Sequence, residues 1–206
     1  MKYLKRIIVY VAGILILALG TVLFTRSHLG VSAIVSVPYT LSLVSPITLG
    51  MCTTIVYSSF VIISLILYRE VKLKVILQLP FSFIFGLVID MYNHFLTLDP
   101  SSIPGRILCL VLAVVFTAIG IAMMVKADFI VNPPDGIVQA ISKVTGKPFG
   151  TAKWICDLAM VIFAAVVGLI AKGKIVGIGI GTIVAVFTIG NLIKLINTKI
   201  MDKIEL

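Results

Sequence analysis

The chain of 206 residues is 60% hydrophobic and 12% charged, and its mean hydropathy of +1.21 excludes an ordinary soluble domain. The net charge of +9 does not indicate nucleic-acid binding, because Lys and Arg occur in short clusters between apolar runs, as in membrane proteins. We therefore predict an all-α, multi-pass membrane protein that lies in the lipid bilayer. Its cysteines, Cys52, Cys109 and Cys156, fall in apolar segments without metal-ligand spacing, so we expect neither a metal nor another cofactor.

The first half of the chain begins with a membrane span and a short helix. The span covers about residues 7–25, an uncharged run that is longer than the apolar core of a signal peptide. Ser32 is a suitable N-cap for a short helix at about residues 32–44, and Pro38 is expected to disturb that helix. A helix of this length can enter the membrane without crossing it.

Two further spans follow. Ser45 and Pro46 look like an N-cap with a first-turn proline, so span two is predicted to start directly after them. Span three covers about residues 75–96, where Pro80 is expected to introduce a kink. Asp90 lies in this span as an intramembrane acid.

The second half repeats this order. Span four covers about residues 107–125, and Asn132 can then cap a second short helix at about residues 132–143. Gly146 and Pro148 are predicted to end this helix and to open span five. Short, interrupted helices of this kind are a feature of transporter binding sites.

Spans five and six, at about residues 149–171 and 175–193, complete two repeats of three spans, residues 1–100 and 101–206. A shift of 100 residues superposes identical or similar residues without a gap. The matched pairs include Ala18 and Ala118, Gly20 and Gly120, Arg26 and Lys126, Gly50 and Gly150, and Ile55 and Ile155. Because three crossings return the chain to the opposite side, the second repeat is predicted to be inverted in the membrane.

The distribution of positive charge favours six spans with two re-entrant helices over eight spans. In the six-span arrangement twelve Lys and Arg residues face the cytoplasm and four face outward, whereas eight spans would give nine against seven. The four outward residues are Arg26, Arg106, Lys172 and Lys174. We therefore predict that both termini are cytoplasmic.

Four stretches resemble the YczE/YyaS/YitT family of bacterial integral membrane proteins. They are residues 20–42, residues 78–90 (QLPFSFIFGLVID), residues 132–157 (NPPDGIVQAISKVTGKPFGTAKWICD) and residues 177–183 (GIGIGTI). The resemblance covers nearly the whole chain and implies a protein of the bacterial cytoplasmic membrane with a role in transport or regulation. Family-like sequences often carry an acid at the end of the last span, where this chain has Lys194.

Charged residues near the second short helix are the main candidates for a solute site. Asp135, at the third position after the Asn132 cap, either favours the helix dipole or lines a cavity at the helix N-terminus. Lys153 and Asp157 are four residues apart on span five, so they form either a structural ion pair or a functional patch. Asp90 is either a proton- or cation-coupling carboxylate or an acid near the outer interface.

The repeat adds polar positions from the first half, since Thr53 and Tyr57 are the counterparts of Lys153 and Asp157. Together the predicted solute contacts are Ser32, Ser36, Thr53, Tyr57, Asn132, Asp135, Gln139, Lys153 and Asp157, with Asp90 as the coupling group.

The sequence predicts a secondary transporter of a small polar or anionic solute, with a site between the inverted repeats near the membrane midplane. The alternative is a non-transporting membrane protein that regulates or assembles another protein, and a homodimer is left open. A carrier needs a polar cavity, whereas a scaffold can pack its centre closed. An enzyme is not expected, because the chain contains neither an H-E-x-x-H nor a G-x-S-x-G motif.

Overall fold

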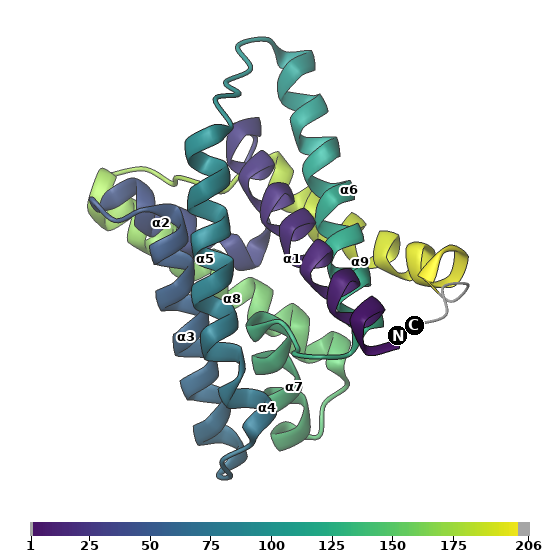
Figure 1. Cartoon of the computed structure of the whole chain (residues 1–206). Coiled ribbons are helices and arrows are strands. Elements are labelled where there is room, and N and C mark those ends of the chain that lie inside the picture. The colour runs from purple at the N-terminus through teal and green to yellow at the C-terminus, as the bar shows by residue number, and fades with distance from the viewer. Residues whose placement is uncertain (1, 202–206) are drawn as a thin grey trace. The chain divides into compact units, whose positions relative to one another are not determined.

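The computed structural model describes residues 2–201, and in this range the chain is helical without any β-strand. The elements are α1 (Lys2–Ser27), α2 (Ala33–Val44), α3 (Leu49–Tyr68), α4 (Leu73–Ile76), α5 (Gln78–Phe95), α6 (Ile103–Ala127), α7 (Pro133–Thr145), α8 (Phe149–Lys172) and α9 (Ile180–Lys199) (Figure 1). The predicted all-α fold is confirmed.

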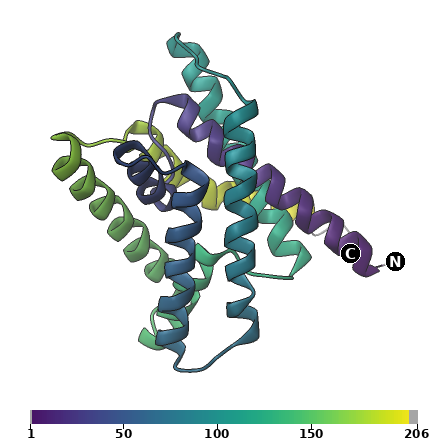
Figure 2. The same ribbon diagram turned by 60° about the vertical axis from the view of Figure 1, so that its left-hand side comes forward.

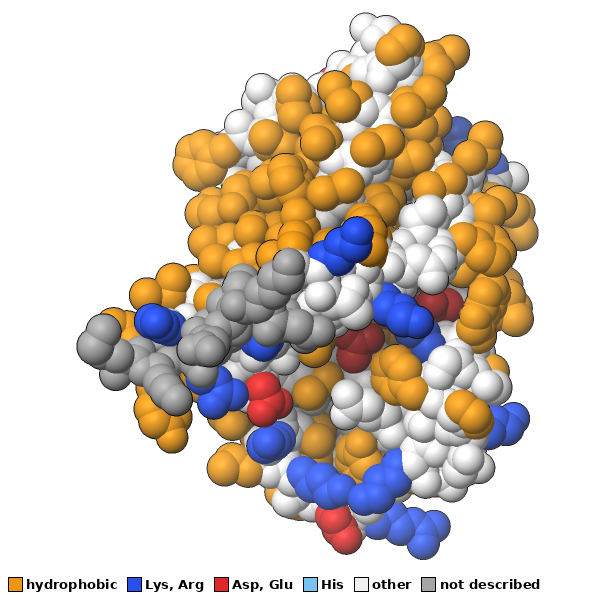
Figure 3. All heavy atoms as spheres, turned by 90° about the vertical axis from the view of Figure 1, so that its right-hand side faces the viewer, with side chains coloured by type: hydrophobic (Ala, Val, Ile, Leu, Met, Phe, Trp, Pro, Cys, Tyr) orange, Lys and Arg blue, Asp and Glu red, His pale blue; other side chains and the backbone are white. Residues whose placement is uncertain are grey.

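Within residues 2–201, six stretches of helix are long and apolar enough to cross a membrane: Tyr3–Ser27, Leu49–Tyr68, Leu73–Phe95, Ile103–Ala127, Phe149–Lys172 and Ile180–Lys199. Each of them carries large hydrophobic side chains that stay exposed, among them Ile8, Ile62, Phe83, Val111, Ile170 and Ile183. Hydrophobic side chains accordingly cover much of the face in Figure 3. Exposed apolar surface of this extent is suited to lipid rather than water, and the chain is a multi-pass membrane protein.

The helices form two compact units. Unit 1 comprises Met1–Ser32, Met91–Phe129 and Gly179–Leu206, and unit 2 comprises Ala33–Asp90 and Ile130–Ile178. Each unit contains segments from both halves of the sequence. The last residues of α5 belong to unit 1, whereas its first part belongs to unit 2.

Unit 1 is organised around the packing of α1 against α6 (Figure 1). Gly20 and Gly120 let the two backbones approach closely, because an added Cβ would lie 2.7 Å from the Thr117 nitrogen at Gly20 and 2.6 Å from the Leu17 nitrogen at Gly120. Small residues in such positions are typical of helix pairs in membranes. The start of α9 is fixed in the same unit, where the Gly181 N–H donates to the Leu29 carbonyl oxygen at 2.7 Å.

Unit 2 contains two helix pairs that correspond to each other in the two halves. The short helix α2 packs against α8, and α7, which begins 100 residues after α2 (residues 33 and 133), packs against α3. The starts of α3 and α8, at Leu49 and Phe149, also lie 100 residues apart. The contact between α2 and α8 therefore corresponds to the contact between α7 and α3, with the two halves of the chain exchanged.

The short helices lie where the sequence predicts them. α7 begins after Asn132, carries Pro133 and Pro134 in its first turn and ends at Gly146, whose φ of 68° is the left-handed conformation of a helix C-cap. Pro148 is the N-cap of α8. Pro38 does not end the first short helix, since it lies buried inside α2, which runs from Ala33 to Val44.

Two predicted boundaries around spans two and three need correction. Span two starts at Leu49 rather than directly after Pro46, because the Thr48 side chain accepts the hydrogen bond of the Met51 N–H and caps α3. Span three is divided into α4 and α5 just before Gln78. Pro80 then falls in the first turn of α5, where its missing N–H breaks no hydrogen bond within the helix.

Span six is predicted from residue 175, but α9 begins only at Ile180. In the preceding segment Gly177 has a φ of +76°, which a helix cannot accommodate. This segment is fixed within unit 2, since the Thr40 hydroxyl donates to the Val176 carbonyl oxygen at 3.2 Å.

Candidate functional site

The charged cluster of unit 2 consists of Asp135 on α7 and Lys153 and Asp157 on α8. The Lys153 Nζ donates to the Asp157 Oδ1 at 3.5 Å, one helical turn further on. The side chains of Lys153 and Asp157 are 37% and 14% exposed, and both charges act on the carboxyl group of the partly buried Asp135. The structure thus brings together the three charged residues predicted for the solute site.

The short length of α7 places Asp135 next to α8. Helix caps at Asn132 and Gly146 limit α7 to little more than three turns, and its first turn contains Asp135. α7 packs against both α3 and α8. A charged residue at the start of a short helix therefore lies against two long apolar helices.

Tyr57 of α3 contributes to this region from the first half of the chain. Its side chain is buried, and the charge of Asp135 acts on its hydroxyl group. The ring stacks on Phe60 and Phe85 with centroid distances of 6.0 and 5.8 Å. Tyr57 is thus an aromatic residue held in a fixed position by two phenylalanine rings.

Gln78, at the first position of α5, was not among the predicted solute contacts. It is buried at 3% exposure, and its side chain lies against Gly136, where an added Cβ would be 2.6 Å from Oε1 and 2.8 Å from Nε2. Its Oε1 has no hydrogen-bond partner among the described residues. An amide at the start of an apolar span was the available signal in the sequence, but its contact with α7 depends on the tertiary fold.

Asn132 occupies the predicted N-cap position of α7 but does not cap it with its side chain. Its backbone carbonyl oxygen accepts from the N–H groups of Asp135 and Gly136, each at 2.9 Å. The Oδ1 atom is buried and lacks a partner among the described residues. We call Tyr57, Gln78, Asn132, Asp135, Lys153 and Asp157 together the unit 2 site.

Asp90 forms its hydrogen bonds with residues outside the unit 2 site. Its Oδ1 accepts from the Gly50 N–H at 2.8 Å and its Oδ2 from the Thr48 hydroxyl at 2.6 Å. A carboxylate at these N–H and O–H groups stabilises the N-terminus of α3. A coupling role for Asp90 stays a prediction.

The other predicted solute contacts are in different surroundings. The hydroxyl groups of Ser36 and Thr53 donate within their own helices, to the carbonyl oxygens of Ala33 and Leu49 at 2.5 and 2.8 Å. Ser32 precedes α2 in the chain, and Gln139 is exposed on α7. None of the contacts described above links these four residues to the unit 2 site, and their solute contacts stay predictions.

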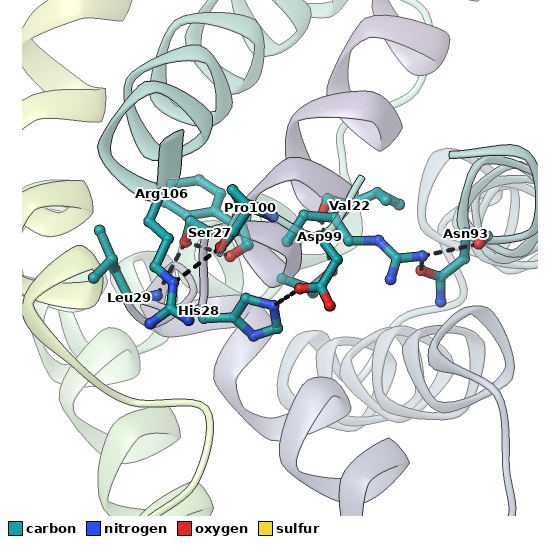
Figure 4. A network of polar contacts seen from close by, with 11 residues as sticks. Val22, Ser27, His28, Leu29, Asn93, Asp99, Pro100 and Arg106 are labelled. Carbon is teal, nitrogen blue, oxygen red and sulfur yellow. Dashed lines mark hydrogen bonds and ion pairs between the residues drawn. The ribbon is translucent and has the colours of Figure 1, made fainter. Parts of the chain in front are cut away.

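Unit 1 contains a separate set of polar contacts, drawn in Figure 4. The Arg26 Nη2 donates to both the carbonyl oxygen and the Oδ1 of Asn93 at 3.0 Å, and the His28 Nε2 lies 2.8 Å from the Asp99 Oδ1. The Arg106 Nε donates to the Pro100 carbonyl oxygen at 3.1 Å. These contacts connect the end of α1, the end of α5 and the start of α6. They are suited to fixing the position of the loop between α5 and α6.

The unit 2 site can bind a small polar molecule through carboxylate, ammonium, carboxamide and phenol groups. Among residues 2–201, no three side chains of His, Cys, Asp or Glu come together as metal ligands. No curated protein and no solved structure matches the chain. One family model, described as a family of unknown function (DUF6198), matches residues 4–198. The chain therefore belongs to this family, DUF6198.

Proposed function

We propose that the protein is a secondary transporter of a small polar solute and that the unit 2 site binds this solute. The observation that carries the proposal is the gathering of Asp135, Lys153 and Asp157 beside apolar membrane helices. Ionisable groups at such positions are unfavourable in lipid and are usually retained for a function. A structural ion pair would account for Lys153 and Asp157, but it would leave Asp135 unexplained.

The composition of the site supports this proposal. Tyr57 and Gln78 come from the first half of the chain, and Asp135, Lys153 and Asp157 come from the second. Transporters built from inverted repeats commonly place their solute site where the repeats meet, next to short or broken helices. The corresponding pairs α2 with α8 and α3 with α7 support an origin from two repeats. A role in transport also agrees with the resemblance to the YczE/YyaS/YitT family.

A transport assay in liposomes tests the proposal. Purified protein reconstituted into liposomes is expected to accumulate at least one compound from a polar metabolite extract when a proton or sodium gradient is imposed. The Lys153→Met variant is expected to lose this accumulation, whereas Lys172→Met, at the exposed end of the same helix, is expected to keep it. Mass spectrometry of the washed liposomes measures both. If the protein retains no compound beyond the level of empty liposomes, it is not a transporter of these solutes.

The proposed orientation has both termini in the cytoplasm of a bacterial cell, with the second repeat inverted. A single cysteine at Val71, which is 82% exposed between α3 and α4, is then expected to resist a membrane-impermeant maleimide in intact cells. A single cysteine at Lys172 is expected to react. Both variants are made in a chain whose three natural cysteines are replaced. Labelling at position 71 from outside would contradict the inverted arrangement.

A further inference from the structure

Gln78 provides the first sign of what the solute must carry. Its side chain is buried at 3% exposure and ends against Gly136, the residue after Asp135, with an Oε1 that lacks a donor among the described residues. A buried acceptor without a donor is unfavourable for folding, and such groups are rare in native structures. A ligand that donates to this oxygen would remove the penalty.

Asn132 provides a second acceptor of the same kind. Its Oδ1 is also buried and unpartnered within the described part of the chain, and the residue lies three positions before Asp135 on the same helix turn. The side chain leaves its capping position unused, since no N–H of α7 donates to it. Two carboxamide oxygens thus need donors near one carboxylate.

The charged groups of the site also favour a solute that donates hydrogen bonds and carries a positive charge. Asp135 and Asp157 contribute two carboxyl groups against the single ammonium group of Lys153, and that ammonium group already donates to Asp157. A bound cationic group would favour the ionised form of both carboxyl groups and balance their charge, whereas a bound anion would oppose their ionisation. Between the polar and the anionic solutes predicted from the sequence, these charges favour a polar solute with a positive group.

We infer that the solute of the unit 2 site carries a primary ammonium group, which donates to the unpartnered oxygens of Gln78 and Asn132 and balances the carboxylates of Asp135 and Asp157. A primary ammonium has three N–H donors and one positive charge, so it meets both needs of the site. A quaternary ammonium has the charge without the donors. The inference rests on the proposed function only in taking the bound molecule to be the transported one.

Thermal unfolding of the purified full chain in detergent tests the inference directly. Methylammonium and ethanolammonium chlorides are expected to raise the unfolding midpoint in a saturable way, as ligands of the native state do. Sodium chloride and tetramethylammonium chloride at the same ionic strength are expected to have no such effect. Stabilisation by sodium acetate or phosphate without stabilisation by the primary amines would overturn the inference, and so would equal stabilisation by tetramethylammonium.

Two variants connect the effect to the site. Gln78→Met, which removes the unpartnered oxygen at similar volume, is expected to unfold at the same temperature as the natural protein or higher without ligand, yet to need at least about tenfold more methylammonium for the same shift. Asp135→Asn is expected to weaken the response likewise, and Asp99→Asn, whose side chain in the natural protein is 80% exposed, is expected to leave it unchanged. An unaltered response in both Gln78→Met and Asp135→Asn would rule out this site for the amine.

The transport assay separates the two proposals. If amines bind as described but liposomes accumulate no compound, the transport function is wrong and the ligand class stands. If liposomes accumulate an anion that lacks an amino group, the protein transports and the ligand class is wrong.

Discussion

Replacing Gly50 with alanine is expected to destabilise unit 2 more than any other single-methyl change discussed for this protein. The added Cβ would collide with the Gly86 carbonyl oxygen and would lie 2.5 Å from the Asp90 Cγ. These atoms belong to α5, which runs antiparallel to α3 beside it (Figure 2). Because the closest atom is backbone, the helices must separate, and overpacking of this kind costs about 1–3 kcal/mol or more.

The repeat supplies a matched control for this change. Gly150 occupies the same position in α8 that Gly50 occupies in α3, and a Cβ there would meet no atom within 4 Å. Gly150→Ala is therefore expected to be neutral or stabilising by up to about 1 kcal/mol, since alanine favours a helix more than glycine does. Thermal unfolding in detergent measures both variants. Equal midpoints for the two would show that α3 and α5 do not pack as closely as described.

Gly50 and Gly86 also show where the packing of the two halves differs. In the sequence repeat, Gly150 is the counterpart of Gly50 and Gly190 is the counterpart of Gly86. Both have open space where a Cβ would go. Asp90, which bonds to the start of α3, is replaced by Lys194 in the second half. A carboxylate can accept from N–H groups at a helix N-terminus, whereas an ammonium group cannot.

The elements of this fold follow from local sequence signals. Apolar runs of sufficient length give the six long helices, and Gly146 and Pro148 mark where α7 ends and α8 begins. The errors arise where tertiary contacts decide. α2 runs on through Pro38, which is buried within unit 2. Hydropathy alone assigns the segment that contains Val176 to a helix. In the structure this segment precedes α9, and the Val176 carbonyl oxygen accepts a hydrogen bond from Thr40.

Of the residues that form the candidate site, the charged ones and Asn132 were predictable from the sequence, but Gln78 was not. Asp135, Lys153 and Asp157 stand out because ionisable residues are rare in apolar runs, and the four-residue spacing places two of them on one helix face. Gln78 is uncharged, and the only signal along the chain is a polar amide at the start of an apolar helix. Its importance comes from a contact with Gly136 on a helix more than fifty residues later.

Lys153→Met distinguishes a solute-binding lysine from a structural one. If Lys153 serves only its ion pair, the variant leaves Asp157 without its partner. The free energy of unfolding then falls by an amount that approaches the cost of breaking a buried pair, about 3–5 kcal/mol. With a side chain that is 37% exposed, the pair is only partly buried, so we expect a smaller loss. We expect accumulation of the solute in liposomes to fall to the level of empty liposomes, because Asp157 loses the partner that positions its carboxyl group for the solute.

The double variant Lys153→Met with Asp157→Leu completes the test. Replacing both partners with apolar groups removes the unpaired charge on α8, so the unfolding midpoint is expected to return close to that of the natural protein. Solute binding is not expected to return, because the site then lacks the carboxyl group of Asp157 that would balance the ammonium group of the solute. Unfolding and liposome accumulation are measured on the same preparation, with Lys172→Met as the control. A double variant that is stable and still accumulates the solute would exclude this pair from the site and leave Asp135, Gln78 and Asn132 to bind the solute without it.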